Sequence, residues 1–294
     1  MPPVFGSPIV ESPIFELADV SFDYEGIPAL RSLSLSIQQG ERIALVGANG
    51  SGKSTLLRIL DALYLPSSGT LRFAGESITQ DRLHDNAFAL SFRRRVALVF
   101  QNPDVQLFNP TVFEEVAFGP LQLRWTNEQV VERVTATLDA LGIAHLKERP
   151  PYRLSGGEKK RVALASVLVL EPEVLLLDEP TAALDPRSQS QLVDLIQGWH
   201  GTARTVITAT HQLEILEDIA DRVYVMQEGQ IITAAEPREL LADGELLVRA
   251  NLIHAHRHTH GGVVHSHPHL HGHSHSDHSH EHPASDEHPS PKSE

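Results

Sequence analysis

At 294 residues, with 41% hydrophobic residues and a mean hydropathy of -0.16, the chain has the composition of a globular protein that can bury a substantial core in one large domain or two modest ones. The absence of cysteine excludes disulfides and thiolate metal sites, and the net charge of -14 argues against wholesale binding to nucleic acid, so no nucleic-acid partner is expected. No apolar stretch approaches the roughly 18 residues of a transmembrane helix, and the first residues lack the features of a secretory signal.

Composition divides the chain into three parts. Residues 1–13 are rich in proline and are expected to form an irregular N-terminus. Residues 14–245 carry alternating strand and helix patterns and are expected to form the folded domain. Residues 246–294 are predicted to be a His-rich tail, because residues 254–294 hold 14 of the 18 histidines.

The strand patterns in the middle part come in two kinds. Residues 14–24 and 33–38 alternate like half-exposed strands, with a turn at Glu25-Gly26. Residues 43–46 form a continuous apolar run, as expected of a central parallel strand covered on both faces, and residues 96–100, 174–177 and 205–208 have the same character. Residues 222–226 and 230–233 predict a closing hairpin. Helical patterns lie between these strands, so the fold class is α/β.

The segment of about 104–165 differs from the rest. Thr111 and Thr126 are each followed three positions later by Glu114 or Gln129, which is the capping-box pattern that opens helices. No convincing strand pattern separates the two helix starts. The segment is therefore predicted to be a helical insertion.

A phosphate-binding loop is predicted between the strand at residues 43–46 and a helical pattern at residues 55–60. Its glycines allow backbone N–H groups to converge on phosphate oxygens, and the following helix adds a positive N-terminus. Lys53 is expected to reach the β- and γ-phosphates of ATP, with the Ser54 hydroxyl on Mg²⁺. The nucleotide-binding residues predicted here are Gly47, Asn49, Gly50, Ser51, Gly52, Lys53, Ser54 and Thr55.

Two adjacent acids end the strand at residues 174–177. Asp178 at this place would hold Mg²⁺, and Glu179 would lie beside the γ-phosphate, where a carboxylate can polarise the attacking water. The alternative is a solvated acidic strand end. Shortly afterwards, Asp185-Pro186 is typical of an N-cap followed by proline in the first helical position.

The segment 154–158 predicts a second helix start. Ser155 and Glu158 have the spacing of a capping box, so a helix is expected to begin there and to run to about residue 169. Its N-terminal amides would present partial positive charge to a phosphate. Taken alone, the segment could be merely a well-capped helix.

In this order, the phosphate loop, the signature Leu154-Ser155-Gly156-Gly157-Glu158 and the paired acids resemble the ATP-binding-cassette (ABC) ATPases. The resemblance covers residues 14 to about 240. It implies a phosphate-loop NTPase fold with a mixed sheet core, an N-terminal antiparallel β-subdomain and an inserted α-helical subdomain. In that family the signature of one subunit closes over the ATP held by another, so the resemblance implies that Ser155, Gly156, Gly157 and Asp185 act with a second ABC ATPase subunit, in a homodimer.

Three single residues take roles from this resemblance. Gln101 matches the glutamine that senses Mg²⁺ or the lytic water and signals to the membrane partner. His211 matches the switch histidine that contacts the γ-phosphate. Tyr24 matches the aromatic residue that stacks on adenine, although a strand tyrosine is otherwise more often a packing residue.

Residues 99–108 and 111–120 resemble, more narrowly, the ATPases of energy-coupling-factor transporters. This implies integral membrane subunits as partners and a peripheral place on the cytoplasmic face of the cell membrane. Such transporters import vitamins or transition-metal ions, and the core motifs do not separate the two.

The tail bears on that choice. Alternate residues of an extended chain share a face, so neighbouring imidazoles there could chelate Ni²⁺, Co²⁺ or Zn²⁺. The low hydrophobicity of the tail predicts disorder without metal, and a solubilising tail or an expression tag is the alternative. The candidate metal ligands are His254, His256, His258, His260, His265, His267, His269, His271, His273 and His275.

The leading hypothesis is therefore the ATPase subunit of an energy-coupling-factor importer for nickel or cobalt. A vitamin-importing ATPase whose tail is incidental is the first rival. The others belong to different classes of protein: a soluble ABC ATPase outside transport, and a metal-buffering protein. The single phosphate loop, without a long coiled-coil insertion or a second cassette, argues against the soluble ATPase.

Overall fold

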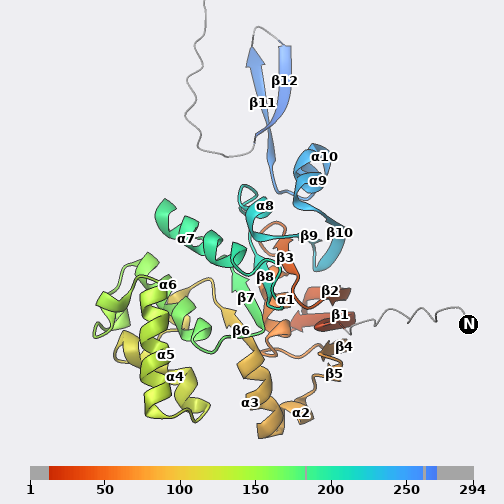
Figure 1. Ribbon diagram of the computed structural model, residues 1–294. Helices are drawn as coiled ribbons and strands as arrows, with labels where there is room; N and C mark the ends of the chain where they lie inside the picture. The colour runs from red at the N-terminus through yellow and green to blue at the C-terminus, as the bar shows by residue number, and fades with distance from the viewer. Residues whose placement is uncertain (1–12, 183, 261–262, 270–294) are drawn as a thin grey trace, which may run out of the picture.

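The computed structural model describes residues 13–182, 184–260 and 263–269. Its larger sheet is mixed, with the strand order β10-β9-β3-β8-β7-β6 (Figure 1). The pairs β9–β3, β3–β8, β8–β7 and β7–β6 are parallel, whereas β10 pairs antiparallel with β9. The strands are β3 (Arg42–Val46), β6 (Val96–Val99), β7 (Val174–Asp178), β8 (Thr205–Ala209), β9 (Arg222–Gln227) and β10 (Gln230–Ala235).

The continuous apolar runs form buried strands, as the sequence predicts. Every residue of β3, β7 and β8 is buried, because side chains on both faces are covered by helices or by the second sheet. The strand predicted at residues 96–100 is not central, however. It ends at Val99 and lies at the edge of the sheet, where the helices α3 (Asn86–Arg95) and α6 (Gly156–Leu168) pack against it and keep it buried. A covered edge strand and a central strand give the same apolar pattern.

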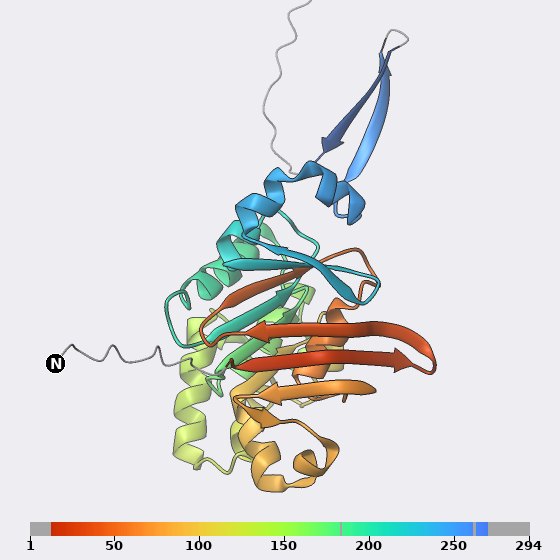
Figure 2. The ribbon, with the colours of Figure 1, turned by 90° about the vertical axis from the view of Figure 1, so that its right-hand side faces the viewer.

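The smaller sheet is antiparallel and has the order β2-β1-β4-β5 (Figure 2). Strand β1 matches the predicted segment 14–24, whereas β2 begins at Ile27, before the predicted segment 33–38. The sequence pattern did not predict β4 or β5. Leu71 and Phe73 are the buried apolar residues of β4, which is too few for a clear alternation. The strands are β1 (Phe15–Tyr24), β2 (Ile27–Ile37), β4 (Ser68–Phe73) and β5 (Glu76–Ser77).

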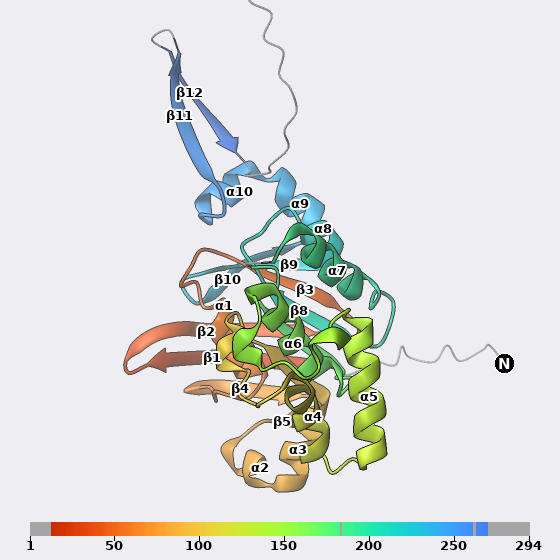
Figure 3. The same cartoon turned by 90° about the vertical axis from the view of Figure 1, so that its left-hand side faces the viewer.

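The three helices of the insertion lie together beside the sheets (Figure 3). They enclose a hydrophobic core of their own, built around Val116, Val134, Leu138 and Val162. Thr126 forms the full predicted capping box, whereas Thr111 accepts from the Glu114 amide without the reciprocal bond. The insertion contains the 3-10 turns Pro103–Val105, Ala144–Leu146 and Pro151–Arg153 and the helices α4 (Val112–Gln122), α5 (Asn127–Ala140) and α6 (Gly156–Leu168).

The remaining helices flank the larger sheet or its ends (Figure 1). Helix α1 directly follows the phosphate loop, and α7 follows the paired acids. Within the described ranges, no helix has both the length and the apolar character needed to cross a membrane. The helices are α1 (Lys53–Leu60), α2 (Gln80–His84), α3 (Asn86–Arg95), α7 (Pro186–Gln197), α8 (Leu216–Ile219), α9 (Pro237–Ala242) and α10 (Gly244–Arg249).

The C-terminal part differs from the expected tail. Leu246, Leu247 and Ile253 pack into the core cluster beside α7, α8 and α9, so the packed body continues past residue 246. Beyond it, where disorder was expected, β11 (His254–His260) and β12 (Val263–His269) pair as an antiparallel hairpin that projects from the body in all three views (Figures 1, 2 and 3). The alternation of histidine with other residues gives low hydrophobicity, but it also suits the period of two of a strand.

Candidate active site

The phosphate loop joins the end of β3 to the start of α1 and depends on its glycines. Gly50 and Gly52 have φ values of 81° and 104°, which L side chains rarely adopt. A Cβ on Gly52 would also lie 2.8 Å from the Ala29 carbonyl oxygen. A Cβ on Gly47 would overlap the carbonyl of Met226. Only glycine at positions 47 and 52 lets the loop pass this close to neighbouring backbone. The freedom of the glycine backbone also allows the amides of the loop to converge.

Lys53 lies at the start of α1 and is 7% exposed. Its Nζ donates to the Gly47 and Ala48 carbonyl oxygens at 2.6 and 3.1 Å. Burial lowers the pKa of Lys53, and the charges of Glu179 and Asp178 oppose that shift. The ammonium group is thus held across the loop, facing the two acids.

Ser54 and Asp178 bring two oxygen atoms together beside the loop. The Ser54 hydroxyl donates to Asp178 Oδ1 at 2.9 Å. Asp178 ends β7 and is 4% exposed, and burial raises its pKa, against the hydrogen bond from Ser54 and the charge of Arg58. A hydroxyl next to a carboxylate is a donor set that a hard cation such as Mg²⁺ prefers.

Glu179 is the next residue, and it is held in an unusual conformation. Its φ is +46°, and its amide donates to the Ala209 carbonyl at 2.9 Å, which ties the turn after β7 to the end of β8. One side-chain oxygen, Oε1, lies 2.9 Å from His211 Nδ1. The other, Oε2, is buried without a hydrogen-bond partner. Backbone strain and an unpaired buried oxygen together mark a functional site.

Lys53, Ser54 and Glu179 line one cleft of about 550 Å³, whereas the predicted site residues Gly47, Asp178 and His211 are not among its lining residues. Tyr24 forms part of its wall, with its hydroxyl 3.2 Å from Thr55 Oγ1 and its ring edge-on to Phe22 and Tyr64. Ile27, Pro28 and Ala29 of β2 add an apolar side. Among the residues predicted from the sequence, the cleft is lined by Tyr24, Asn49, Gly50, Ser51, Gly52, Lys53, Ser54, Thr55, Gln101 and Glu179.

The signature residues lie elsewhere. Ser155 caps α6 with the full capping box that the sequence predicts, and Asp185 caps α7 with Pro186 in its first turn. A Cβ on Gly157 would lie 3.9 Å from Asp185 Oδ2, so the two helix starts are neighbours. None of Ser155, Gly156, Gly157 and Asp185 is among the residues that line the cleft. The chain thus presents two capped helix N-termini outside its own cleft.

Lys160 lies in α6, is 2% exposed and is not among the site residues predicted from the sequence. Its Nζ donates to the carbonyl oxygens of Phe100 and Gln101, both at 3.0 Å. Burial lowers the pKa of Lys160 to about 8, and the charges of Asp178 and Glu179 oppose the shift. The sequence signal that could have identified Lys160 is its place on the apolar face of the predicted helix, which it shares with Ala163 and Leu164.

Among the side chains that the structure describes, no group of three or more His, Asp or Glu could hold a metal ion. The side chains of residues 254–260 and 263–269 are not among those described, so the tail ligands stay predictions. His271, His273 and His275 lie outside the described residues.

The cleft fits ATP with Mg²⁺ on three observations. The glycine loop offers amides, Lys53 offers a charge, and Ser54 with Asp178 offers the oxygen pair. The unpaired Oε2 of Glu179 completes the set with a free acceptor. A carboxylate with an open lone pair can accept a hydrogen bond from a water molecule near the terminal phosphate.

Comparison with known proteins agrees with this geometry. The family model for ABC transporters matches residues 30–182. A nickel import ATP-binding protein of Rhodobacter capsulatus is 52% identical over 245 residues, covering 82% of this chain and 96% of that protein. An energy-coupling factor transporter ATP-binding protein of Methanospirillum hungatei is 44% identical over 241 residues, covering 82% of this chain and 60% of that protein.

Two solved structures share the fold. The structure of cbiO1 from Clostridium perfringens, part of the ABC transporter complex cbiONQ, matches with a TM-score of 0.69 and 38% identity, over 82% of this chain and 96% of that one. The ATP-binding cassette MJ0796, in a dimeric post-hydrolysis state bound to ADP and phosphate, matches with a TM-score of 0.68 and 26% identity, over 76% of this chain and 99% of that one.

Proposed function

The chain belongs to the ABC transporter family, and from that premise we propose that it is the ATP-hydrolysing subunit of an energy-coupling-factor importer for nickel or cobalt ions. The observation that carries the ATPase activity is the cleft lined by Lys53, Ser54 and Glu179, with Asp178 accepting a hydrogen bond from the Ser54 hydroxyl beside it. The choice of metal as cargo is supported by the nickel import relative, which is matched over almost its whole length.

ATP would bind with its adenine against Tyr24 and its phosphates on the glycine loop and Lys53. Ser54 and Asp178, with Gln101 at the edge of the cleft, would hold Mg²⁺, which neutralises phosphate charge when bound. Glu179 would accept a hydrogen bond from the attacking water. As the water oxygen bonds to the γ-phosphorus, the bond from that phosphorus to the bridging oxygen breaks, ADP keeps the bridging oxygen, and the water proton passes to Glu179.

His211 would assist hydrolysis by contacting Oε1 of Glu179, while Oε2 accepts from the attacking water. With one ring nitrogen 2.9 Å from Glu179 Oε1, it fixes the direction of that carboxylate, and the remaining ring nitrogen is left for the γ-phosphate. The side chain of His211 is 60% exposed, so it can turn toward a bound nucleotide.

A second copy would complete each site. Ser155, Gly156 and Gly157 would contact the ATP held by the other copy, and Asp185 would lie beside them at the same interface. The position of these residues outside the chain's own cleft supports this arrangement, as does the dimeric form of the related cassette. Since one chain carries both halves of the site, a homodimer would have two competent sites.

Membrane subunits would bind at the surface that follows Gln101. Val105 and Phe108 there are 68% and 67% exposed, and Phe118 of α4 packs edge-on against Phe108. Exposed aromatic and aliphatic side chains grouped in this way are typical of a protein interface. Docking there would place the chain peripherally at the membrane.

The His-rich tail would bind Ni²⁺, Co²⁺ or Zn²⁺. In β11 and β12, the backbone register sets His254 opposite His269, His256 opposite His267 and His258 opposite His265. Cross-strand partners at alternate positions lie on one face of a hairpin, which supports a shared metal site.

The experiment that tests the cargo is co-purification with membrane neighbours, followed by uptake of labelled Ni²⁺ and Co²⁺ against a panel of vitamins. Metal uptake that needs ATP hydrolysis supports the proposal, and vitamin uptake without metal uptake refutes it. Tight metal binding with no membrane partner would favour a buffering protein. Deleting residues 254–294 tests the tail: unchanged metal uptake and unchanged metal dependence would refute its role.

A further inference from the structure

Helix α6 holds the loop 100–106 through its most deeply buried charge. The Lys160 ammonium donates to two consecutive carbonyl oxygens, those of Phe100 and Gln101, each at 3.0 Å. Gln101 lines the nucleotide cleft, and its carbonyl oxygen accepts a hydrogen bond from the Lys160 ammonium. Because the carbonyl is fixed by a charged donor that is 2% exposed, the place of Gln101 depends on the place of α6.

Two further contacts fasten the same loop to the same helix. Lys159 Nζ lies 2.6 Å from Asp104 Oδ1, one position away from Lys160 along α6. Gln106 Nε2 donates to the Ala163 carbonyl at 2.9 Å, one turn further on, and Gln106 Oε1 accepts from the amide of residue 100 at 3.3 Å. The loop is therefore attached at three places along the first turns of α6.

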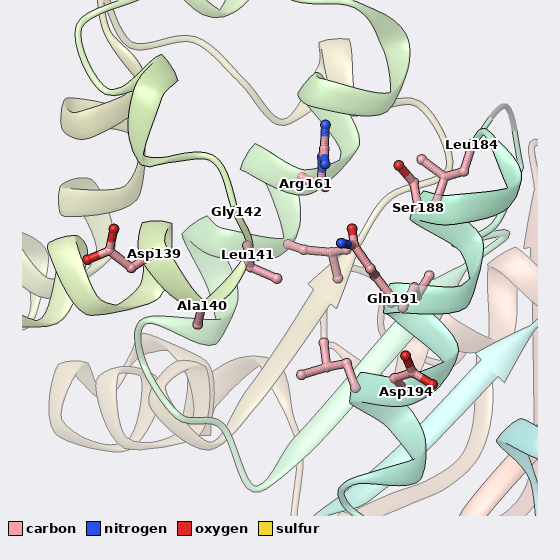
Figure 4. A pocket seen from close by; sticks show the side chains of 12 residues that line it. Asp139, Ala140, Leu141, Gly142, Arg161, Leu184, Ser188, Gln191 and Asp194 are labelled. Atoms are coloured by element: carbon pink, nitrogen blue, oxygen red, sulfur yellow. The ribbon is translucent and has the colours of Figure 1, made fainter.

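The opposite side of α6 faces α7, and Leu164 there packs in one hydrophobic cluster with Leu192. A cavity of about 410 Å³ lies between α6, the end of α5 and α7, with Leu141 and Arg161 on one wall and Ser188 and Gln191 on the other (Figure 4). The Arg161 Nε atom is buried and has no hydrogen-bond partner. Charged and polar contacts thus join α6 to the loop 100–106, whereas Leu164 of α6 meets α7 through the apolar cluster that also holds Leu192.

We propose that Lys160 is a positioning residue that, with Lys159 and Gln106, fastens the loop 100–106 to α6 and so holds Gln101 at the nucleotide cleft. The inference rests on the proposed function, in which Gln101 acts beside the bound ATP and Mg²⁺. Without the Lys160 ammonium, the loop would lose the two charge-assisted bonds that fix its first residues.

The direct test is amide hydrogen exchange of the full-length protein without nucleotide. Lys160→Met removes the charge and both carbonyl bonds while keeping a similar shape. Exchange in residues 100–106 is expected to rise about ten- to hundredfold, the range for losing charge-assisted hydrogen bonds, while exchange in α7 stays unchanged. Lys147→Met is the matched control. Lys147 lies in the same helical insertion, but its ammonium lies over the Phe113 ring instead of bonding to the loop 100–106. Unchanged exchange in residues 100–106 overturns the proposal.

A second variant guards against loss of fold. Lys159→Gln breaks only the ion pair with the largely exposed Asp104, and is expected to raise exchange in residues 100–106 up to about fivefold. If Lys160→Met exchanges rapidly throughout the chain, Lys159→Gln decides the question. A rise in exchange confined to residues 100–106 supports the proposal, and no rise overturns it.

Kinetics separate a positioning role from a merely structural one. In Lys160→Met, kcat for ATP is expected to fall about ten- to hundredfold, while the dissociation constant for ATP changes by less than about threefold. A dissociation constant that rises as much as kcat falls would overturn positioning. A wild-type protein without ATPase activity would refute the proposed function instead, and the exchange result would still decide whether the loop is fastened.

Discussion

His211 Nδ1 lies 2.9 Å from Glu179 Oε1, and this contact joins the ends of two neighbouring strands. Glu179 directly follows β7 and His211 follows β8, and the two strands are parallel neighbours in the sheet. The amide of Glu179 also donates to the Ala209 carbonyl, which locks the two strand ends together. The pairing of β7 with β8 therefore sets the positions of Glu179 and His211 relative to one another.

Replacing the carboxylate tests its part in hydrolysis. Glu179→Gln keeps the size of the side chain and removes its charge and basicity, so ATP binding is expected to persist while kcat falls by about 10²–10⁴-fold. Because closure over ATP would no longer be followed by hydrolysis, a stable nucleotide-bound dimer is also expected. Steady-state ATPase assays and size-exclusion chromatography with ATP check both results. Glu148→Gln, at an exposed position, is the control, and near-normal turnover in Glu179→Gln would remove Glu179 from this role.

The contact itself is tested by a double-mutant cycle. If His211 acts by holding Glu179, then His211→Ala is expected to lower kcat strongly in the wild-type background and only slightly in Glu179→Gln. The two residues would then behave as one unit. Additive losses of log kcat in the double variant would show that His211 acts independently, through the phosphate alone.

Lys53 is expected to govern binding of ATP. Lys53→Met removes the charge that faces the phosphates, so the dissociation constant for ATP should rise about ten- to hundredfold, as for the loss of a charge-assisted hydrogen bond. Stability should change little, because the loss of two carbonyl contacts is offset by relief from burying the ammonium. Calorimetric titration with ATP and a thermal scan measure the two effects. Lys147→Met should leave both near wild type, and ATP affinity unchanged in Lys53→Met would contradict the assignment.

The sequence predicts the parts of this site that are local, and not those that depend on tertiary contacts. The phosphate loop and the caps at Ser155 and Asp185 each depend on a few consecutive residues, and the structure contains all of them. Lys160 gives no such signal, because its partners are backbone carbonyls 59 and 60 positions away, which no side-chain pattern reveals.

Glu115 also has tertiary contacts that the sequence does not reveal, although it lies in the first turn of a predicted helix. It is 3% exposed and accepts from the amides of Phe108 and Asn109 at 2.8 and 2.7 Å, so it shapes the surface proposed to meet the membrane subunits. The edge position of β6 and the hairpin of β11 and β12 were missed for a related reason. Strand order and pairing are set by packing between distant segments, whereas periodicity describes only one segment.

Asp61 should make stability depend on pH. It is the C-cap of α1, where the negative end of the helix dipole disfavours an ionised acid, and burial raises its pKa to about 8, against the charge of Arg93. In the unfolded chain this carboxyl ionises near pH 4. Between these values unfolding releases a proton, so the contribution of Asp61 to stability is fully present below about pH 4 and is lost as pH rises to about 8.

Asp61→Asn removes this titration while keeping the shape of the side chain. The variant is expected to be more stable than wild type at pH 8 by about 1–2 kcal/mol, or roughly 2–8 °C in Tm, with little difference near pH 4. Thermal unfolding at several pH values measures the trend. The exposed Asp81 provides the control: Asp81→Asn should show the pH dependence of the wild type. A gain in stability that is the same at pH 4 and pH 8 would mean that the pKa of Asp61 is not raised in the folded protein.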